Sequence, residues 1–262
     1  MATEQRKFWG QKTFCLVTGA SQGIGRNFAI EFCRKFAAGS SVILLARSLT
    51  KLEETRKLIV TANPDVEVEV HSVDLSLPDA KKFKEILSSY AKSRYDFYLL
   101  VNNAGSVGNT KHSAAAMNDL EEWSRYMSLN LYSTTMLTSE FLQVFNSGQR
   151  CILNITSLCA LQPFKSMGYY CIGKASREMY FRVLAEENPS LDILNYSPGP
   201  VDTDMVSGLI DNLENEETRS MFVSMKSSNT LVTLGETTKK CIDVLASGKY
   251  TSGGRFDYFD PL

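Results

Sequence analysis

The segment Thr18-Gly19-Ala20-Ser21-Gln22-Gly23-Ile24-Gly25 decides the fold class of this chain. It follows a short apolar run at residues 14–17 and opens a helical pattern over residues 24–36. Glycines permit positive φ and let a ligand approach the backbone, while the free N–H groups of a helix N-terminus attract phosphate. The segment therefore predicts a strand, a tight turn and a helix that hold a dinucleotide pyrophosphate. A tight turn with a purely structural role is the alternative interpretation.

Short apolar runs alternate with longer amphipathic segments along the rest of the chain. We expect further strands at residues 42–45, 66–73, 97–101, 151–155 and 191–195, and helices at residues 51–61, 79–90, 120–145 and 170–187. Several of the strands are continuous apolar runs, as expected where helices cover both faces of a parallel sheet. The repeated βα units predict an α/β fold, a single doubly wound Rossmann-type domain.

The chain shows no linker, repeat or low-complexity tract that would divide it. We expect a polar N-terminal extension at residues 1–12 and one domain at residues 13–262. Residues 212–228 are more charged and less periodic than the rest. Two interpretations of that segment stay open, a mobile lid and a solvated helix pair.

The composition is typical of a globular protein, with 44% hydrophobic residues and a formal net charge of -1 over 262 residues. This charge gives no electrostatic argument for a nucleic acid or an anionic membrane as partner. No stretch approaches the ~18 apolar residues of a membrane span, and the polar N-terminus lacks the apolar core of a secretory signal. The expected compartment is therefore the cytosol. Six cysteines without a CxxC pair, and only two histidines, predict buried thiols and no metal site.

The end of the second predicted strand indicates which nucleotide binds. NAD-binding sheets usually carry an acidic residue there, which grips the ribose 2′-hydroxyl. This chain reads Leu45-Ala46-Arg47-Ser48 instead, without a carboxylate. A guanidinium suits a 2′-phosphate, so Arg47 favours NADP, although an ordinary exposed arginine is the alternative.

Two further strand ends add to the predicted cofactor site. The carboxylate of Asp74, followed by Leu75, is placed to accept a hydrogen bond from the adenine amino group. The run Asn102-Asn103-Ala104-Gly105 closes the next strand, at the edge where ligands collect in open α/β sheets. Small residues in that run would let the backbone approach a ring closely. Together these strand ends predict one wall of the site.

Tyr170 and Lys174 are the first candidates for catalysis. Four residues apart at the start of a helical segment, they share a helix face. Tyr169 also precedes the lysine, but at five residues it points about 140° away around the helix. An ammonium beside a phenol stabilises the phenolate, so we expect Lys174 to lower the pKa of Tyr170 toward the range of proton exchange.

Two more polar side chains complete the candidate catalytic set. Ser157 follows the strand at residues 151–155, and its hydroxyl is placed to hydrogen-bond a substrate carbonyl oxygen. Thr156 is a competing hydroxyl. Asn130 lies inside a helical segment, where its amide is predicted to bond the helix backbone and hold a water for proton relay. An exposed helix asparagine without a role is the alternative for Asn130.

The glycine loop, the Asn-Asn-Ala-Gly run, Asn130, Ser157 and the Tyr170-x-x-x-Lys174 pair resemble the short-chain dehydrogenase/reductase family. The resemblance implies a nicotinamide-dependent oxidoreductase with Ser157, Tyr170, Lys174 and Asn130 as catalytic residues. The family pattern also favours Ser157 over Thr156 as the hydroxyl that bonds the substrate. The expected cofactor residues, for NADP, are Gly19, Ser21, Gln22, Gly23, Ile24, Gly25, Arg47, Ser48, Asp74, Leu75, Asn102, Ala104, Gly105, Tyr170, Lys174, Val201, Asp202, Thr203, Asp204, Met205 and Val206.

A closer resemblance within the family covers residues 154–165, 170–175, 195–205 and 252–260. These segments are similar to members that use NADPH to reduce the side-chain ketones of pteridines, the last steps of tetrahydrobiopterin synthesis. The resemblance implies a homodimer packed through the helices at residues 120–145 and 170–187. It implies that the pterin contacts Ser157, Leu158, Tyr170, Gly199 and Asp257. A broader carbonyl or diketone reductase and a non-catalytic NADP-binding sensor are the alternatives.

Asp257 has a physical rationale beyond the resemblance. A pterin presents a planar edge with adjacent N–H donors, and one carboxylate accepts both in a bidentate way. Asp260 is the rival for this role. One departure from the subgroup lies in the glycine loop, where an arginine is frequent and this chain has Gln22. That departure reduces the positive charge expected around the 2′-phosphate.

Overall fold

The computed structural model describes residues 8–262. Within these residues, seven parallel strands form one sheet in the order β3-β2-β1-β4-β5-β6-β7. The order reverses between β1 and β4, which is the switch point where ligands bind in open α/β sheets. The strands are β1 (Thr13–Thr18), β2 (Ser41–Ala46), β3 (Glu67–Ser72), β4 (Phe97–Asn102), β5 (Gln149–Ile155), β6 (Asp192–Ser197) and β7 (Arg255–Asp257).

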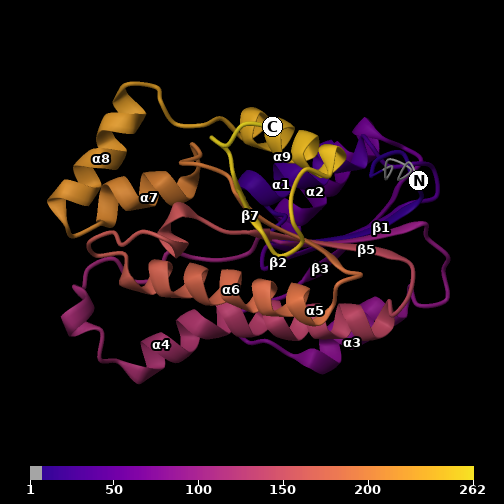
Figure 1. The fold of residues 1–262 in the computed structure, drawn as a ribbon, viewed down its shortest axis with the longest axis horizontal. Coiled ribbons are helices and arrows are strands. Elements are labelled where there is room, and N and C mark those ends of the chain that lie inside the picture. The colour runs from indigo at the N-terminus through magenta and orange to yellow at the C-terminus, as the bar shows by residue number, and fades with distance from the viewer. Residues whose placement is uncertain (1–7) are drawn as a thin grey trace.

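Helices cover both faces of this sheet (Figure 1). One face carries α1 (Gly23–Cys33), α2 (Leu49–Ala62) and α9 (Leu234–Ser247), and the other carries α3 (Ala80–Ser88), α5 (Ser133–Val144) and α6 (Gly168–Glu187). The helix α4 (Leu120–Met127) continues into α5 through a π-helical turn, Ser128–Tyr132. The helices α7 (Asp204–Asn212) and α8 (Glu216–Ser227) stand apart from these two layers (Figure 1).

Strand β2 shows why the predicted strands are continuous apolar runs. Val42 and Leu44 pack in the cluster that contains Phe28 of α1. The alternate residues Ile43 and Leu45 pack in the cluster on the other face, with side chains of α3, α5 and α6. Because successive side chains of a strand point to opposite faces, a strand covered on both sides needs apolar residues at every position. The predicted doubly wound α/β fold is confirmed.

Several elements differ from the sequence-based expectation. The predicted helix over residues 120–145 is interrupted by the π-helical turn at Ser128–Tyr132. The segment at residues 212–228 is largely helical, and it pairs with the helix before it. The prediction included neither α9 nor β7. The start of α9 carries a recognisable signal, because Thr233 and Glu236 form a reciprocal capping box.

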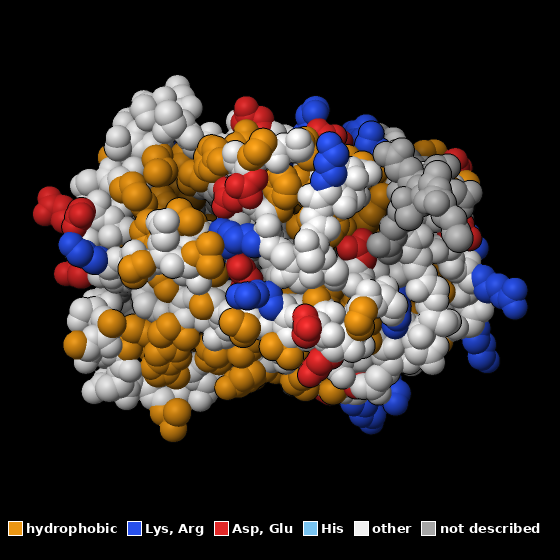
Figure 2. Space-filling view, viewed as in Figure 1, with side chains coloured by type: hydrophobic (Ala, Val, Ile, Leu, Met, Phe, Trp, Pro, Cys, Tyr) orange, Lys and Arg blue, Asp and Glu red, His pale blue; other side chains and the backbone are white. Residues whose placement is uncertain are grey.

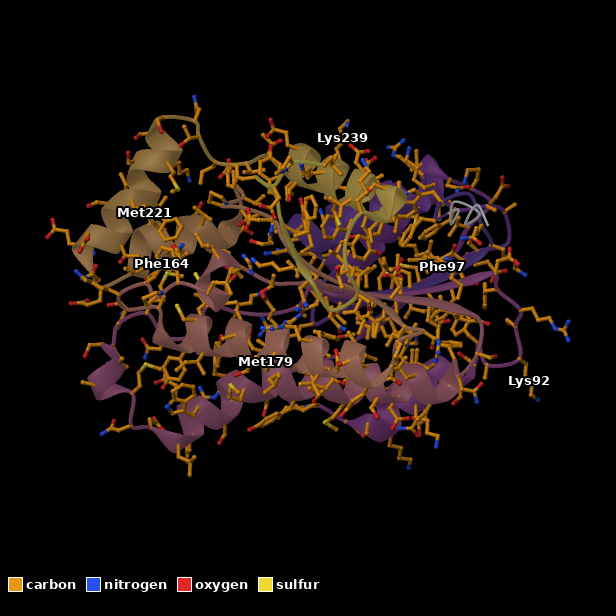
Figure 3. The ribbon with its side chains drawn as sticks, in the orientation of Figure 1. Lys92, Phe97, Phe164, Met179, Met221 and Lys239 are labelled. Carbon is orange, nitrogen blue, oxygen red and sulfur yellow. The ribbon has the colours of Figure 1, made fainter. Side chains whose placement is uncertain are left out.

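Phe8 lies in the predicted N-terminal extension but packs with the domain. Phe8 is 4% exposed, and its ring centre lies 4.8 Å from that of Phe97 in the core. Phe97 is labelled in Figure 3. Residues 1–7 of that extension lie outside the described residues. Among residues 8–262, no helix is long and apolar enough to cross a membrane.

All six cysteines are free thiols. Five are buried as predicted, whereas Cys171 is only half-buried. In the part of the chain that the structure describes, no group of three or more His, Cys, Asp or Glu side chains is arranged to hold a metal ion.

Candidate active site

Two adjoining cavities open at the carboxyl ends of the strands. The first, of about 590 Å³, is lined by the glycine loop and the residues that follow β2, β3 and β4. The second, of about 900 Å³, is lined by residues after β5 and β6 and by α6, α7 and α8. Ile24, Asn103, Thr203 and Met205 line both cavities, so the two form one continuous site.

The glycine loop is packed tightly against the end of β4. Gly19 has φ +67°, and a Cβ atom there would lie 2.8 Å from Asn103 Nδ2. A Cβ atom on Gly25 would overlap Gly19 O and the same amide group. Gly19, Ser21, Gln22, Gly23 and Ile24 line the first cavity, whereas Gly25 lies beneath the loop. Gly25 therefore lets α1 start close to the strands and does not face a ligand.

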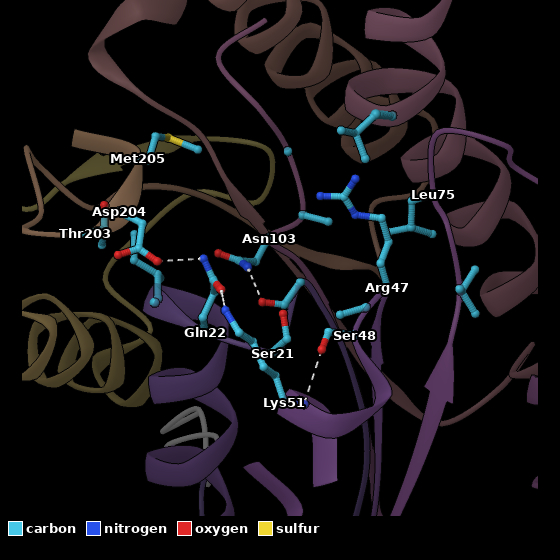
Figure 4. A pocket seen from close by; sticks show the side chains of 18 of the residues that line it. Ser21, Gln22, Arg47, Ser48, Lys51, Leu75, Asn103, Thr203, Asp204 and Met205 are labelled. Atoms are coloured by element: carbon cyan, nitrogen blue, oxygen red, sulfur yellow. Dashed lines mark hydrogen bonds between the residues drawn. The ribbon is translucent and has the colours of Figure 1, made fainter. Parts of the chain in front are cut away.

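Positive charge gathers at the β2 end of the first cavity. Arg47, Ser48 and Lys51 all line it (Figure 4). Lys51 Nζ donates a hydrogen bond to Gln22 Oε1 at 2.7 Å, and Gln22 Nε2 donates to Asp204 Oδ2 at 3.0 Å. The sequence-based site omitted Lys51. The available signal was Ser48, which caps α2 and places Lys51 in its first turn.

The ends of β3 and β4 form the remaining wall of this cavity. The backbone N–H and hydroxyl of Ser76 hold the pKa of Asp74 below its ordinary value, with a smaller contribution from Arg47. Leu75, Ala104 and Gly105 line the cavity as predicted. Asn102 does not, because its fully buried amide donates to Thr138 Oγ1 beneath the site. The next residue, Asn103, lines both cavities in its place.

Tyr170 and Lys174 lie on one face of α6 and line the second cavity. Lys174 is 5% exposed, and its ammonium donates a hydrogen bond to the Ile155 carbonyl at 2.6 Å. Tyr169 points away from this site, because its hydroxyl donates to Glu122 at 2.9 Å. The structure thus separates the two adjacent tyrosines in the way that helix geometry predicts.

The pKa of Tyr170 is raised above the ordinary value, chiefly by burial. A hydrogen bond with the Ser157 hydroxyl and the charge of Arg177 oppose this rise. Lys174, expected to lower that pKa, is not among the groups that do so, and burial holds its own pKa well below the ordinary value. Because burial lowers the pKa of Lys174 and raises that of Tyr170, the lysine is neutral in the pH range in which the phenol titrates. A phenol with a raised pKa carries its proton at neutral pH.

The hydroxyls of Thr156 and Ser157 have different partners. Thr156 is buried and donates to Glu178 Oε2 at 2.6 Å. Ser157 Oγ accepts from the N–H of Cys159 at 3.2 Å and lies at the second cavity beside Tyr170. This leaves the Ser157 hydroxyl as the group that can reach a ligand oxygen.

Asn130 lies in the π-helical turn and is 2% exposed. Its Nδ2 donates to the Tyr126 carbonyl at 2.9 Å, which is the predicted bond to the helix backbone. Its Oδ1 accepts from the N–H of Ser106 at 2.8 Å. Asn130 lines neither cavity, so its contacts tie the helix to the loop after β4.

Arg177 is a buried cation that the sequence-based site omitted. It is 1% exposed on α6 and donates to the carbonyls of Asn102 and Ala104, each at 2.7 Å. Its Nε and one terminal nitrogen also donate to Asn154 Oδ1, at 3.2 and 2.8 Å. Burial lowers the pKa of Arg177 to about 10, so the guanidinium stays charged at neutral pH. No motif marked this residue, because its partners come from β4 and β5.

The second cavity is mostly apolar, with a polar end. Phe164 and Met221 approach from separate segments, Phe164 from the loop before α6 and Met221 from α8 (Figure 3). The polar end is formed by Arg255, Asp257 and Asp260. Of the remaining predicted residues, Asp202 and Asp204 line the first cavity, Thr203 and Met205 line both, and Leu158, Gly199, Val201 and Val206 line the second. The cavity can accept an apolar carbonyl compound that carries hydrogen-bond donors at one end.

Comparison with known proteins agrees with this geometry. Residues 13–214 match the family model described as short chain dehydrogenase. Sepiapterin reductase of Rattus norvegicus is 36% identical over 253 residues, 94% of this chain and 96% of that protein. Benzil reductase ((S)-benzoin forming) of Bacillus subtilis (strain 168) is 33% identical over 198 residues, 72% of this chain and 75% of that protein.

Solved structures agree with the fold. A short chain dehydrogenase from Salmonella enterica subsp. enterica serovar Typhi str. CT18 superposes with a TM-score of 0.77 at 25% identity, covering 99% of this chain and 100% of that one. Levodione reductase gives a TM-score of 0.79 at 20% identity, covering 95% of this chain and 96% of that one. On its fold, its site and its matched residues, the chain belongs to the short-chain dehydrogenase family, a family of oxidoreductases.

Proposed function

We propose that this protein uses NADPH to reduce the side-chain ketones of pteridines, converting sepiapterin to dihydrobiopterin and 6-pyruvoyl-tetrahydropterin to tetrahydrobiopterin. One observation carries the proposal. The hydroxyls of Tyr170 and Ser157 and the carboxylate of Asp257 belong to residues that line the same, mostly apolar cavity. The relatives named sepiapterin reductase, which cover 94% of this chain, support the same substrate class.

The first cavity fits the cofactor. Arg47 and Lys51 supply two cations for the 2′-phosphate, and Lys51 replaces the charge that Gln22 does not carry. The glycine loop at the N-terminus of α1 supplies N–H groups for the pyrophosphate. Asp74 lines the same cavity and would accept a hydrogen bond from the adenine amino group. Thr203 and Met205 line both cavities and would hold the nicotinamide end. Bound NADPH would supply a hydride to the carbonyl carbon.

The chain's own groups act on the carbonyl oxygen. Tyr170 gives its phenolic proton to that oxygen as the carbonyl becomes an alcohol. Ser157 donates a hydrogen bond to the same oxygen and stabilises its developing negative charge. The positive charge of Arg177 favours the phenolate that is left behind. Lys174, held by Ile155, keeps the Tyr170 face of α6 in place.

Asp257 would recognise the pterin ring of the substrate by hydrogen bonds. Each oxygen of an ionised carboxylate has about two acceptor positions, so the carboxylate can take two adjacent N–H donors of a pterin. Asp260 lines the same end of the cavity, but its Oδ2 accepts from the backbone N–H of Asp257. Asp260 thus helps to hold the turn, and we propose Asp257 for the ligand because each of its oxygens, although already bonded once, keeps capacity for a further donor.

A second candidate function is a broader reduction of aromatic ketones and vicinal diketones. The apolar side chains of Leu158, Phe164 and Met221 around the second cavity favour it, because they place no specific demand on a ligand. The similarity to benzil reductases supports the same alternative. A non-catalytic sensor has less support, since it would have no chemical need for Ser157, Tyr170 and Lys174 together.

NADPH oxidation with sepiapterin and with diacetyl, a small vicinal diketone, separates the two candidates. We expect turnover of sepiapterin, and a much larger rise of its KM than of the diacetyl KM in Asp257→Ala. Asp260→Ala serves as the neighbouring carboxylate control and should affect sepiapterin less. Turnover of diacetyl alone would favour the second candidate. Equal effects of Asp257→Ala on the two substrates would mean that Asp257 does not read the pterin.

We also propose a homodimer that packs through α4, α5 and α6. Hydrophobic side chains gather over α4 and α6 on the surface (Figure 2). Ile172, Met179 and Val183 of α6 are 45%, 52% and 47% exposed, and their spacing places them on one helix face. Light scattering after size exclusion tests this, with a dimer expected and a monomer for Met179→Asp with Val183→Asp.

A further inference from the structure

Arg255 lies beside Asp257 at the polar end of the second cavity. The two residues are the first and third of β7, so their side chains leave the same face of the strand. One terminal nitrogen of the guanidinium donates to Asp257 Oδ2 at 3.2 Å. The side chains of Arg255 and Asp257 are 16% and 21% exposed, so the pair is shielded from most of the solvent.

The other terminal nitrogen of Arg255 contacts the catalytic segment. It donates to the Ser157 carbonyl at 3.0 Å and to Glu178 Oε2 at 2.8 Å. Glu178 lies on α6, which also carries Tyr170, and its side chain is 7% exposed. One guanidinium therefore joins the edge strand, the loop of the catalytic serine and the helix of the catalytic tyrosine.

This arrangement fixes the orientation of the Asp257 carboxylate. Oδ2 accepts from Arg255, and Oδ1 accepts from the backbone N–H of Phe259 at 3.2 Å. Two donors on different oxygens determine the plane of the group, and each oxygen keeps capacity for a further donor. Because the same cation also bonds the Ser157 carbonyl, the distance between the carboxylate and the reacting end of the cavity is constrained as well.

Charge balance at this end also depends on Arg255. Glu178 and Asp257 both bond its guanidinium, and neither has an ion pair with another cation among the described residues. Asp260 adds a third carboxylate nearby. Loss of the cation would leave Glu178 buried with Thr156 as its donor, and a buried carboxylate without a cation is costly.

We propose that Arg255 is a positioning residue for the substrate. It acts through Asp257, holding the carboxylate at a set distance from Ser157 and Tyr170 so that the enzyme distinguishes a pterin from other carbonyl compounds. The proposal rests on the proposed function, because it assigns to Arg255 the pterin selectivity of that same site. A small diketone has no N–H donors for Asp257, so its KM should not change when Arg255 is replaced.

The test compares Arg255→Met and Arg255→Lys with the wild type, using sepiapterin and diacetyl as substrates. We expect Arg255→Met to raise the sepiapterin KM roughly tenfold or more, as for loss of one charge-assisted bond, with the diacetyl KM nearly unchanged. Arg255→Lys should recover part of the loss. Arg34→Met, at an exposed arginine at the end of α1, is the matched control and should change neither KM.

Two further variants protect the test against misfolding. Glu178→Gln combined with Arg255→Met removes the buried unpaired charge, and its sepiapterin KM should stay high while its thermal midpoint recovers. In Asp257→Ala, adding Arg255→Met should change the sepiapterin KM by less than twofold, because Arg255 acts through the missing carboxylate.

The outcomes distinguish a failure of the positioning role from a failure of the proposed function. Sepiapterin turnover by the wild type with an unchanged KM in Arg255→Met overturns the positioning role alone. An equal rise of both KM values also overturns it, since that is the effect of a general structural residue. A wild type that reduces diacetyl but neither reduces nor binds sepiapterin overturns the proposed function and this inference with it.

Discussion

The ammonium of Lys174 lies over the ring of Tyr170, 5.5 Å from the ring centre. This geometry follows from the bond between Lys174 and the Ile155 carbonyl, which draws the ammonium toward the end of β5. The two side chains are thus held as one unit on α6. Burial raises the pKa of the phenol, which suits the proton-donor role that we propose for Tyr170.

Replacement of Tyr170 by phenylalanine removes that proton. We expect Tyr170→Phe to lower kcat by about 100-fold or more with both sepiapterin and diacetyl, with NADPH affinity little changed. Steady-state kinetics and NADPH fluorescence titration measure the two effects. Tyr169→Phe is the adjacent control, since it loses only the hydrogen bond to Glu122 and should cost about 1 kcal/mol of stability. Undiminished turnover in Tyr170→Phe would remove the proton-donor assignment.

Arg47 and Lys51 should together determine the preference for NADPH over NADH. We expect Arg47→Ala and Lys51→Ala each to weaken NADPH binding about three- to tenfold, with NADH binding almost unchanged, because in the proposed site these cations would contact only the 2′-phosphate. Isothermal titration at low and high salt measures this, and the loss should shrink at high salt. Lys57→Ala, an exposed lysine on the same helix α2, is the control. An equal loss of NADH affinity would contradict the assignment.

Arg177 should contribute strongly to stability. Arg177→Met would leave the Asn102 and Ala104 carbonyls and Asn154 Oδ1 without this buried donor. We expect the free energy of unfolding to fall by at least about 3 kcal/mol, measured by urea denaturation. Arg182→Met, at an exposed position on α6, should change it by less than about 0.5 kcal/mol. Similar values for the two variants would show that the buried bonds of Arg177 add no net stability.

Cys171 should be the most reactive thiol of the chain. A hydrogen bond from the Cys159 thiol lowers the pKa of Cys171 to about 7, and the residue is half-buried, whereas the other cysteines are buried. The thiolate is the nucleophile, so alkylation by iodoacetamide should rise with pH through a midpoint near 7. Peptide mass spectrometry identifies the site, and Cys171→Ser should abolish the early modification. Labelling of Cys15 or Cys241 at an equal rate would contradict the burial of those thiols.

Local patterns predicted most of the fold. The strand, glycine turn and helix at residues 13–33 depend on neighbours in the chain, and so does the shared helix face of Tyr170 and Lys174. The α/β class follows because each βα unit carries its own apolar periodicity. The observed ends of strands and helices differ from the predicted ends by a few residues, because capping and packing decide where an element stops.

Pairings across the sheet could not be read from such patterns. The sequence indicated a run of small residues after β4, but only the fold shows that Asn103 lines the site while Asn102 turns beneath it. The same is true of Lys51, which reaches Gln22 from another helix.

The sequence by itself determined the α/β class, the glycine loop between the first strand and helix, and the spacing of Ser157, Tyr170 and Lys174. The tertiary structure alone decided how Arg255 joins Glu178, Ser157 and Asp257, and how Arg177 supports the strand ends. Arg255 and Glu178 are 77 positions apart in the chain. Local propensity acts over a few residues, whereas such contacts exist only after parallel strands and helices have packed in one register.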